Sequence, residues 1–235
     1  YVVTVSESTK CELGSLGFDE EKIKVVYNGL SSNLKVRSSS EKRVSFPLIV
    51  YFGRVKKYKR LNHLILAAKE VSLKFPNVKV VIAGKGDAEV YEELAALAKQ
   101  VELGDVVKLY GEVDDAKKKD ILQSAWVYAI PSMKEGFGIS VIEAQALGLP
   151  VVAYAVPGLF DSVKHLVSGI LVKDGDVKAF AKALIMVCGN RMLMGKLSKG
   201  AREIANQYDW DKSAEEFLSL LTRFLVTPSS SYCNH

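Results

Sequence analysis

The sequence predicts an α/β protein built on a Rossmann-like, doubly wound parallel sheet of about six strands. From about residue 48 onward, short apolar runs of strand length alternate with segments of helical periodicity. The strand runs are apolar throughout, which indicates strands that are buried on both faces. Several runs end at glycine-containing turns, as expected where parallel strands lead into helices.

The individual elements follow from periodicity and boundary residues. A strand at 1–5 precedes a helix that Ser6 can cap, and a strand at 23–27 ends at the Asn28-Gly29 turn. Residues 31–45 are rich in Ser, Lys and Arg without apolar periodicity, which predicts a linker. The six core strands are expected at 48–52, 78–83, 106–109, 126–130, 151–154 and 170–172. Further helices are expected at 61–75, 89–101, 115–124, 140–147, 159–163, 177–188, 193–207 and 210–225, before a frayed tail at 227–235.

Composition excludes several classes of protein. Lys and Arg (32) exceed Asp and Glu (27) by five, a mild basicity that suits an anionic ligand or an acidic membrane surface. No dense basic stripe is interleaved with aromatics, so no nucleic-acid partner is predicted. Cys11, Cys188 and Cys233 are far apart and lack CxxC spacing, which argues against a disulfide framework or a zinc site and favours a reducing compartment. No apolar run reaches the roughly 20 residues that span a bilayer.

The most informative turns all follow predicted strands. They are Gly53-Arg54, Gly84-Lys85-Gly86, Gly111-Glu112-Val113 and the stretch 131–138. Because the carboxyl ends of parallel strands share one edge of a sheet, we expect these turns to converge on one crevice.

The stretch from Glu135 to Glu143 carries the strongest signal. Glu135-Gly136-Phe137-Gly138 and then Glu143 place two carboxylates around two glycines at a strand-to-helix turn. Glycines allow a ligand to approach the backbone, and a helix N-terminus attracts an anion. Carboxylates accept hydrogen bonds from hydroxyls. The combination suits a nucleotide sugar; the plainer alternatives are an exposed loop acid and a first-turn acid that complements the helix dipole.

The other turns admit two interpretations each. Arg54, with Lys59 five residues later, could clamp a diphosphate, or the region could be a solvated basic loop. Gly84 begins a turn that matches neither a dinucleotide fingerprint nor a P-loop; it is either a tight turn or a point where backbone approaches a ligand. Backbone before Val113 could bracket a nucleobase. Asp161 could be a surface acid, and the three histidines form no metal-ligand pattern.

With these residues in hand, nearly the whole chain resembles the carboxyl-terminal domain of retaining glycosyltransferases of the GT-B fold, most closely family 4, the glycosyl transferases group 1. Gly53-Arg54 with Lys59 matches the family's Gly-Arg…Lys-Gly stretch, and Glu135 to Gly138 with Glu143 matches its pair of glutamates. The residues that depart from the family pattern are Arg60 in place of glycine, Pro157-Gly158 in place of a glycine pair, Asp161 in place of glutamate, and His165-Leu166 in place of Asp-Gly.

The resemblance implies a role for each matching residue. Arg54 and Lys59 would hold the donor diphosphate and stabilise it as it leaves, Glu135 would contact hydroxyls of the donor sugar, and Glu143 would bind the ribose hydroxyls. The implied catalytic set is Arg54, Lys59 and Glu135. The implied donor-binding set is Gly53, Gly84, Val113, Gly136, Phe137, Gly138, Ile139, Ser140 and Glu143, with backbone N–H groups of 137–140 facing the sugar and phosphates. The donor is a substrate, and no cofactor or metal ion is required.

The resemblance also predicts a domain arrangement. Residues 1–45 would be the remnant of an N-terminal domain with the interdomain linker, 46–208 the nucleotide-sugar donor-binding domain, and 209–235 a C-terminal helix and tail. An N-terminal acceptor domain, in the same or a partner chain, would complete the enzyme. No initiator methionine precedes Tyr1, so we interpret the chain as part of a longer protein, with processing as the alternative.

Two other functions stay open from the sequence. One is a non-catalytic nucleotide-sugar binding module or subunit, and the other is a phosphorylase that uses phosphate in place of a nucleotide. The expected location is the cytoplasm, with peripheral contact at the cytoplasmic face of a membrane as a further option.

Overall fold

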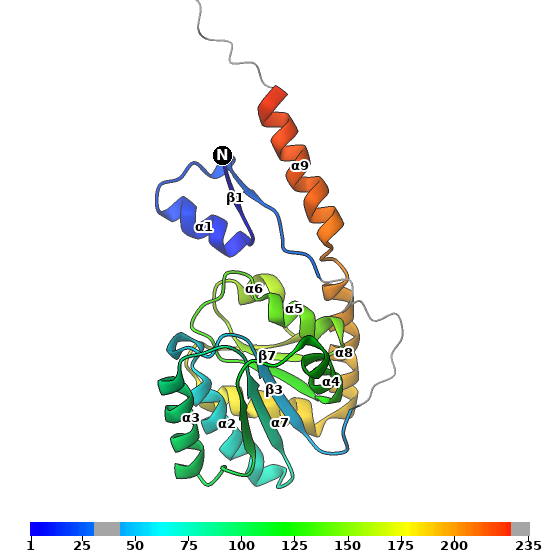
Figure 1. The fold of residues 1–235 in the computed structure, drawn as a ribbon. Helices are drawn as coiled ribbons and strands as arrows, with labels where there is room; N and C mark the ends of the chain where they lie inside the picture. Colours follow the sequence, from blue (N-terminus) through cyan, green and yellow to red (C-terminus); the bar gives the residue numbers. More distant parts are fainter. Residues whose placement is uncertain (31–42, 227–235) are drawn as a thin grey trace, which may run out of the picture.

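A six-stranded parallel sheet forms the centre of the protein (Figure 1). The computed structural model describes residues 1–30 and 43–226. The strands lie in the order β5-β4-β3-β6-β7-β8, so the direction of winding reverses between β3 and β6. Their bounds are β3 Leu48–Phe52, β4 Lys79–Ala83, β5 Val107–Tyr110, β6 Val127–Ile130, β7 Val151–Tyr154 and β8 Gly169–Val172. The carboxyl ends of β3, β4 and β5 are in register, with Phe52 beside Ala83 and Ala83 beside Tyr110.

Helices cover both faces of this sheet (Figure 1). One group has α2 packed against α3 and α7, and in another α5 packs against α8. Strands β3, β6 and β7 are buried along their whole length, which explains why they are apolar at every position rather than at alternate ones. The helix bounds are α2 Leu61–Lys74, α3 Ala88–Gln100, α4 Asp115–Ser124, α5 Ile139–Ala146, α6 Leu159–Ser162, α7 Val177–Gly189 and α8 Arg191–Ala205.

The two ends of the described chain lie together beyond this sheet. In Figure 1, α1 and β1 lie on the same side of the sheet as α9, with α1 against α6. Strands β1 and β2 form a separate two-stranded parallel sheet. The elements are β1 Val2–Thr4, α1 Glu7–Ser15, the 3₁₀ helix η1 Glu20–Lys22, β2 Ile23–Val25 and α9 Trp210–Val226.

A second, small apolar cluster joins these ends to the main body. It contains buried residues from the segment before the linker, from α5 and its preceding loop, and from the end of α8; they are Leu30, Phe137, Ile142, Ala146, Ala205 and Tyr208. Leu30 pairs with Asp209 in a parallel β-bridge. A Cβ atom added to Gly29 would lie 2.2 Å from the backbone nitrogen of Trp210. The chain entering the main body and the chain leaving it are therefore packed directly against each other.

The predicted fold class is confirmed, and so are the predicted strands and helices. Their boundaries differ from the expected ones by no more than two residues. Two short 3₁₀ helices, η1 and η3 (Lys57–Lys59), were not expected. Residues 31–42 of the predicted linker and the predicted tail lie outside the described residues, and the three-part domain division stays a prediction. Within the described ranges, no helix has the length and apolar content needed to cross a membrane.

Candidate functional site

The turns after β3, β4 and β5 are hydrogen-bonded to one another at one edge of the sheet. The N–H of Gly53 donates to the carbonyl of Ala83 (3.1 Å), and the N–H of Gly84 donates to the carbonyl of Gly111 (3.0 Å). A Cβ atom on Gly84 would lie 1.9 Å from the Gly53 carbonyl oxygen. The expected convergence of these turns is therefore present, and packing between two turns by itself accounts for the glycine at position 84.

Lys59 and Glu135 form an ion pair at the same edge. Lys59 Nζ lies 2.5 Å from Glu135 Oε1, and the two side chains are only 7% and 11% exposed. The Ser132 hydroxyl donates to the same oxygen (2.7 Å). The N–H of Met133 donates to the carbonyl of Tyr58 (2.9 Å), which ties the two loops together. Lys59 is thus no part of a solvated loop and Glu135 is no exposed acid, so both plainer interpretations are wrong.

The turn at Pro157-Gly158 packs against the loop that carries Glu135. The N–H of Glu135 donates to the carbonyl of Pro157 (3.2 Å). Gly158 has φ +80°, and a Cβ atom there would lie 2.0 Å from the Glu135 carbonyl oxygen. Glycine is required here for two reasons. Other residues rarely adopt this φ, and their Cβ atom would clash with the Glu135 carbonyl oxygen.

The N-terminus of α5 has no side chain capping it. Gly138 is the N-cap residue, no side-chain oxygen accepts from the first turn, and that turn contains no acid. Among the described residues, no group accepts a hydrogen bond from the N–H groups of Phe137, Gly138, Ile139 and Ser140. Such a helix end is suited to bind an anion.

The Phe137 side chain points away from this helix end into the second apolar cluster. It is buried, and its ring centroid lies 5.5 Å from that of Tyr27 and 5.0 Å from that of Tyr208. Its ring therefore anchors the loop and leaves only its backbone at the helix end.

Glu143 is paired with a lysine that the sequence analysis did not single out. Lys118 Nζ, from α4, lies 2.6 Å from Glu143 Oε2. Glu143 is the fifth residue of α5 and the first turn contains no acid, so the interpretation as a first-turn acid is wrong. Lys118 was missed because it belongs to the run Lys117 to Lys119, which has the sequence pattern of a solvated helix face.

Two tyrosines beneath the site were also missed. The Tyr128 hydroxyl donates to the carbonyl of Phe52 (2.5 Å) and lies 2.9 Å from the Ser140 hydroxyl oxygen. The Tyr51 hydroxyl donates to the carbonyl of Arg54 (2.9 Å). Burial raises the pKa of Tyr128 above its usual value, and the nearby carboxylates add to the rise. Both hydroxyls are therefore neutral donors that fix backbone around the site. Tyr51 lies near the carboxyl end of β3, which was an available signal, whereas Tyr128 is the second residue of β6 and had no such signal.

Arg54 and Val113 complete the predicted set. Arg54 is exposed, and no acidic side chain in the described ranges pairs with its guanidinium, so it is available to an anionic ligand. Val113 is half-buried and lies just before α4, five residues from Lys118. The structure thus brings Lys59 into contact with Glu135. Arg54 and Val113 follow β3 and β5 at the same edge, with the turn after β4 between them.

Arg60 and Asp161, which also depart from the family pattern, have clear structural roles. Arg60 adopts a left-handed conformation (φ +48°) and pairs with Asp174 (2.6 Å). Asp161 is buried and accepts hydrogen bonds from the N–H of Glu7 (3.0 Å) and from the N–H and hydroxyl of Ser8 (3.3 and 2.5 Å). Asp161 therefore binds the first turn of α1, and its interpretation as a surface acid is wrong.

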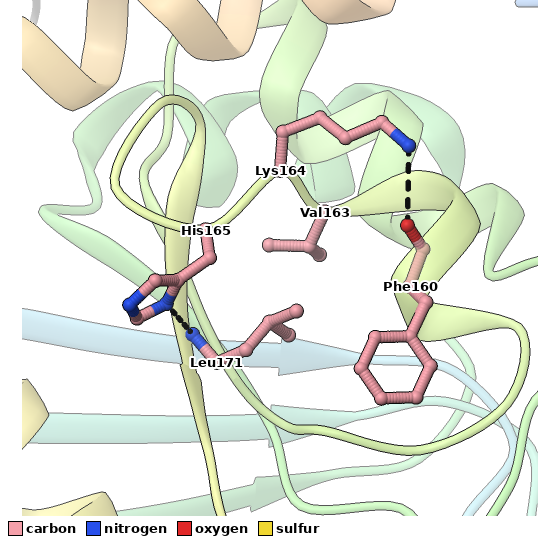
Figure 2. Close-up of a pocket in the computed structure, with 5 residues that line it drawn as sticks. All are labelled: Phe160, Val163, Lys164, His165 and Leu171. Carbon is pink, nitrogen blue, oxygen red and sulfur yellow. Dashed lines mark hydrogen bonds between the residues drawn. The ribbon is translucent and has the colours of Figure 1, made fainter.

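A separate pocket of about 530 Å³ lies outside the predicted site, between α6 and β8 (Figure 2). His165 Nδ1 accepts from the N–H of Leu171 (3.0 Å), and Lys164 Nζ donates to the carbonyl of Phe160 (3.2 Å). Both polar side chains therefore stabilise the pocket's own loop. In the parts of the chain that the structure describes, no group of three or more acidic, histidine or cysteine side chains could hold a metal ion.

Comparison with known proteins identifies the family of this chain. Residues 33–204 match the model of the family described as glycosyl transferases group 1. An uncharacterized glycosyltransferase of Methanocaldococcus jannaschii is 33% identical over 232 residues, which cover 93% of this chain and 59% of that protein. D-inositol 3-phosphate glycosyltransferase of Xylanimonas cellulosilytica is 32% identical, with 87% of this chain and 52% of that protein covered.

Solved structures show the same fold. HepE of Anabaena, in a complex with UDP and glucose, has a TM-score of 0.86 at 23% identity, and the match covers 94% of this chain and 63% of that one. TarM of S. aureus, in a complex that includes UDP, has a TM-score of 0.82 at 24% identity, covering 93% of this chain and 43% of that one. The described sheet is thus one half of a GT-B arrangement, as predicted.

The chain spans about half the length of the curated relatives it matches. The family match covers most of the chain, including the turns after β3 to β6 and both glutamates. This chain belongs to the glycosyl transferases group 1 family.

Proposed function

We propose that this chain is the donor-binding part of a retaining glycosyltransferase that transfers a sugar from a nucleoside-diphosphate sugar to an acceptor. The observation that carries the proposal is the enclosed Lys59–Glu135 pair beside the uncapped N-terminus of α5. This region combines a positive charge, free N–H groups and carboxylate oxygens. It lies at the carboxyl ends of the strands, where α/β sheets bind ligands. The UDP complexes of HepE and TarM support a nucleotide ligand.

The proposed roles follow from the chemistry of each group. Arg54, Lys59 and the N–H groups of α5 hold the diphosphate and counter the charge that develops as it leaves. Glu135 keeps one carboxylate oxygen on Lys59 and offers the other to hydroxyls of the donor sugar. Glu143 accepts from the ribose. Backbone before Val113 contacts the base. In this scheme cationic side chains neutralise the leaving group, and no metal ion is required.

Calorimetry with UDP, GDP and ADP tests the donor site. The chain should bind at least one of them, and Glu143→Ala should reduce that affinity because a ribose hydroxyl loses its acceptor. A folded sample that binds none of the three would contradict the proposal, and an unchanged affinity in Glu143→Ala would remove the ribose assignment.

Retention and the acceptor domain need a second experiment. We propose that an N-terminal domain, in the same or a partner chain, binds the acceptor, since this chain spans about half of its relatives. The chain joined to that domain should release product whose anomeric configuration equals that of the donor, as read from NMR coupling constants. An inverted product would contradict the mechanism.

The alternative is a non-catalytic nucleotide-sugar binding module. It is favoured if the joined protein binds donor but neither transfers nor hydrolyses it. A cytoplasmic location, with peripheral contact at the cytoplasmic face of a membrane, is part of the proposal, and fractionation of cells that produce the protein tests it.

A further inference from the structure

The structure contains a second lysine–glutamate pair that resembles the first. Lys118 in α4 and Glu143 in α5 are 22% and 17% exposed, and Lys118 Nζ contacts Glu143 Oε2 at 2.6 Å. In the first pair, Lys59 and Ser132 both contact Oε1 of Glu135. Each glutamate therefore has one oxygen held by an ammonium group.

The other oxygen of each glutamate has no protein partner. Within residues 1–30 and 43–226, no donor reaches Glu143 Oε1 or Glu135 Oε2. Glu143 Oε1 also remains accessible to solvent. In those ranges the one fully buried side-chain oxygen or nitrogen without a partner is Gln145 Oε1, so Glu143 Oε1, which has no partner either, is not fully buried. A carboxylate held on one side thus presents its second oxygen in a fixed direction.

We infer that Lys118 is a positioning residue for ribose recognition: it holds Oε2 of Glu143, so that Oε1 is presented to a ribose hydroxyl of the nucleotide. This inference rests on the proposed function, because it takes the ligand to be a nucleoside diphosphate. It assigns Lys118 a role through Glu143 and none on the base or the phosphates.

If Lys118 positions Glu143, the affinity for a nucleoside diphosphate depends on Lys118 only when the ribose carries hydroxyls. Lys118→Met keeps much of the side-chain length but removes the ammonium. It should weaken binding of the nucleoside diphosphate by roughly tenfold, since a charge-assisted hydrogen bond loses its fixed acceptor. Binding of the 2′,3′-dideoxy nucleotide, which has no hydroxyl to lose, should be unchanged. Lys118→Arg should retain most of the affinity.

Lys117→Met is the matched control on the same helix. Lys117 Nζ lies 4.5 Å from the centroid of the Tyr110 ring and is in no ion pair among the described residues. Its loss removes the same charge from α4 and should change neither affinity. Calorimetry uses whichever of UDP, GDP and ADP binds the unaltered chain most tightly, and circular dichroism checks that every variant is folded.

The outcomes separate this inference from the proposed function. Loss confined to the hydroxyl-bearing nucleotide in Lys118→Met supports the inference. Equal losses for both nucleotides place Lys118 on the phosphates or the base and overturn it, as does an unchanged or higher affinity. If the unaltered chain binds no nucleotide, the proposed function and this inference fall together. An unfolded Lys118→Met sample leaves the decision to Lys118→Gln, tested in the same way.

Discussion

Lys59 Nζ lies 2.5 Å from Oε1 of Glu135, and both side chains are almost completely enclosed by the loops that follow β3 and β6. Removing either residue of a buried ion pair destabilises the folded protein, because the other residue is left buried without a counter-charge.

Lys59→Met should therefore lower the free energy of unfolding by about 3 kcal/mol, because the Glu135 carboxylate keeps only the Ser132 hydroxyl as a partner. Urea denaturation measures the loss. Lys69→Met is the control, since its partner Glu102 is 84% exposed and exposed pairs contribute little. Equal losses in the two variants would show that the Lys59–Glu135 pair is not effectively buried.

Gly158→Ala should disrupt the loop that carries Glu135. The new Cβ atom would lie 2.0 Å from a backbone oxygen, and φ there is +80°. We expect a loss of about 3 kcal/mol in stability, together with weaker nucleotide binding. Gly111→Ala is the matched control, because a Cβ atom there meets nothing within 4 Å. If Gly158→Ala behaves like Gly111→Ala in thermal unfolding, the close approach of the two loops is not real.

Phe137→Ala tests whether the second apolar cluster anchors the donor loop. Phe137 packs against Tyr27 and Tyr208, so its truncation should lower the free energy of unfolding by about 3 kcal/mol. Hydrogen exchange should accelerate at 27–30 and at 208–213, two segments that are hydrogen-bonded to each other beside this cluster. Phe160→Ala removes a ring that is 51% exposed and should leave exchange in both segments unchanged. Protection that persists in Phe137→Ala would argue against the anchor.

His63 makes stability depend on pH. Burial lowers the pKa of His63 below 6.5, the charge of Arg60 adds to this, and Asp174 partly opposes it. The folded state thus binds the proton more weakly than the unfolded state. The contribution of His63 to the free energy of unfolding is fully present above pH 6.5. It declines as the pH falls from there toward the lowered pKa. In His63→Gln, the decline between pH 7 and pH 5 should be shallower by urea denaturation. Identical slopes would rule out His63 as a contributor.

The sequence was sufficient for the fold because the fold depends on local patterns. Uniformly apolar strand runs and helical periodicity located the elements, and a parallel sheet then requires that Gly53, Gly84, Gly111 and Glu135 share one edge. The hydrogen bonds between the first three turns confirm this. The positions of these residues along the chain were enough to predict that they lie near one another. Their roles toward a ligand stay proposals.

What the sequence missed depends on contacts between distant segments. Lys118 looks like part of a solvated lysine run, and its approach to Glu143 follows from how α4 and α5 pack. Asp161 looks like a surface acid, but it binds the first turn of α1, more than 150 residues earlier. Neither contact leaves a mark in local periodicity, because each is decided by the arrangement of whole helices.

The packing of Gly29 against Trp210 has a consequence for the order of folding. These residues are separated by most of the chain, and contacts between such distant segments form slowly, since a long loop must close before they gain any stability. The sheet and its helices, whose strands follow one another closely, can form first. We therefore expect the first thirty residues to dock last and to bring Tyr27 to Phe137 at that step. In that order of events, the loop before α5 would be completed only after the sheet has formed.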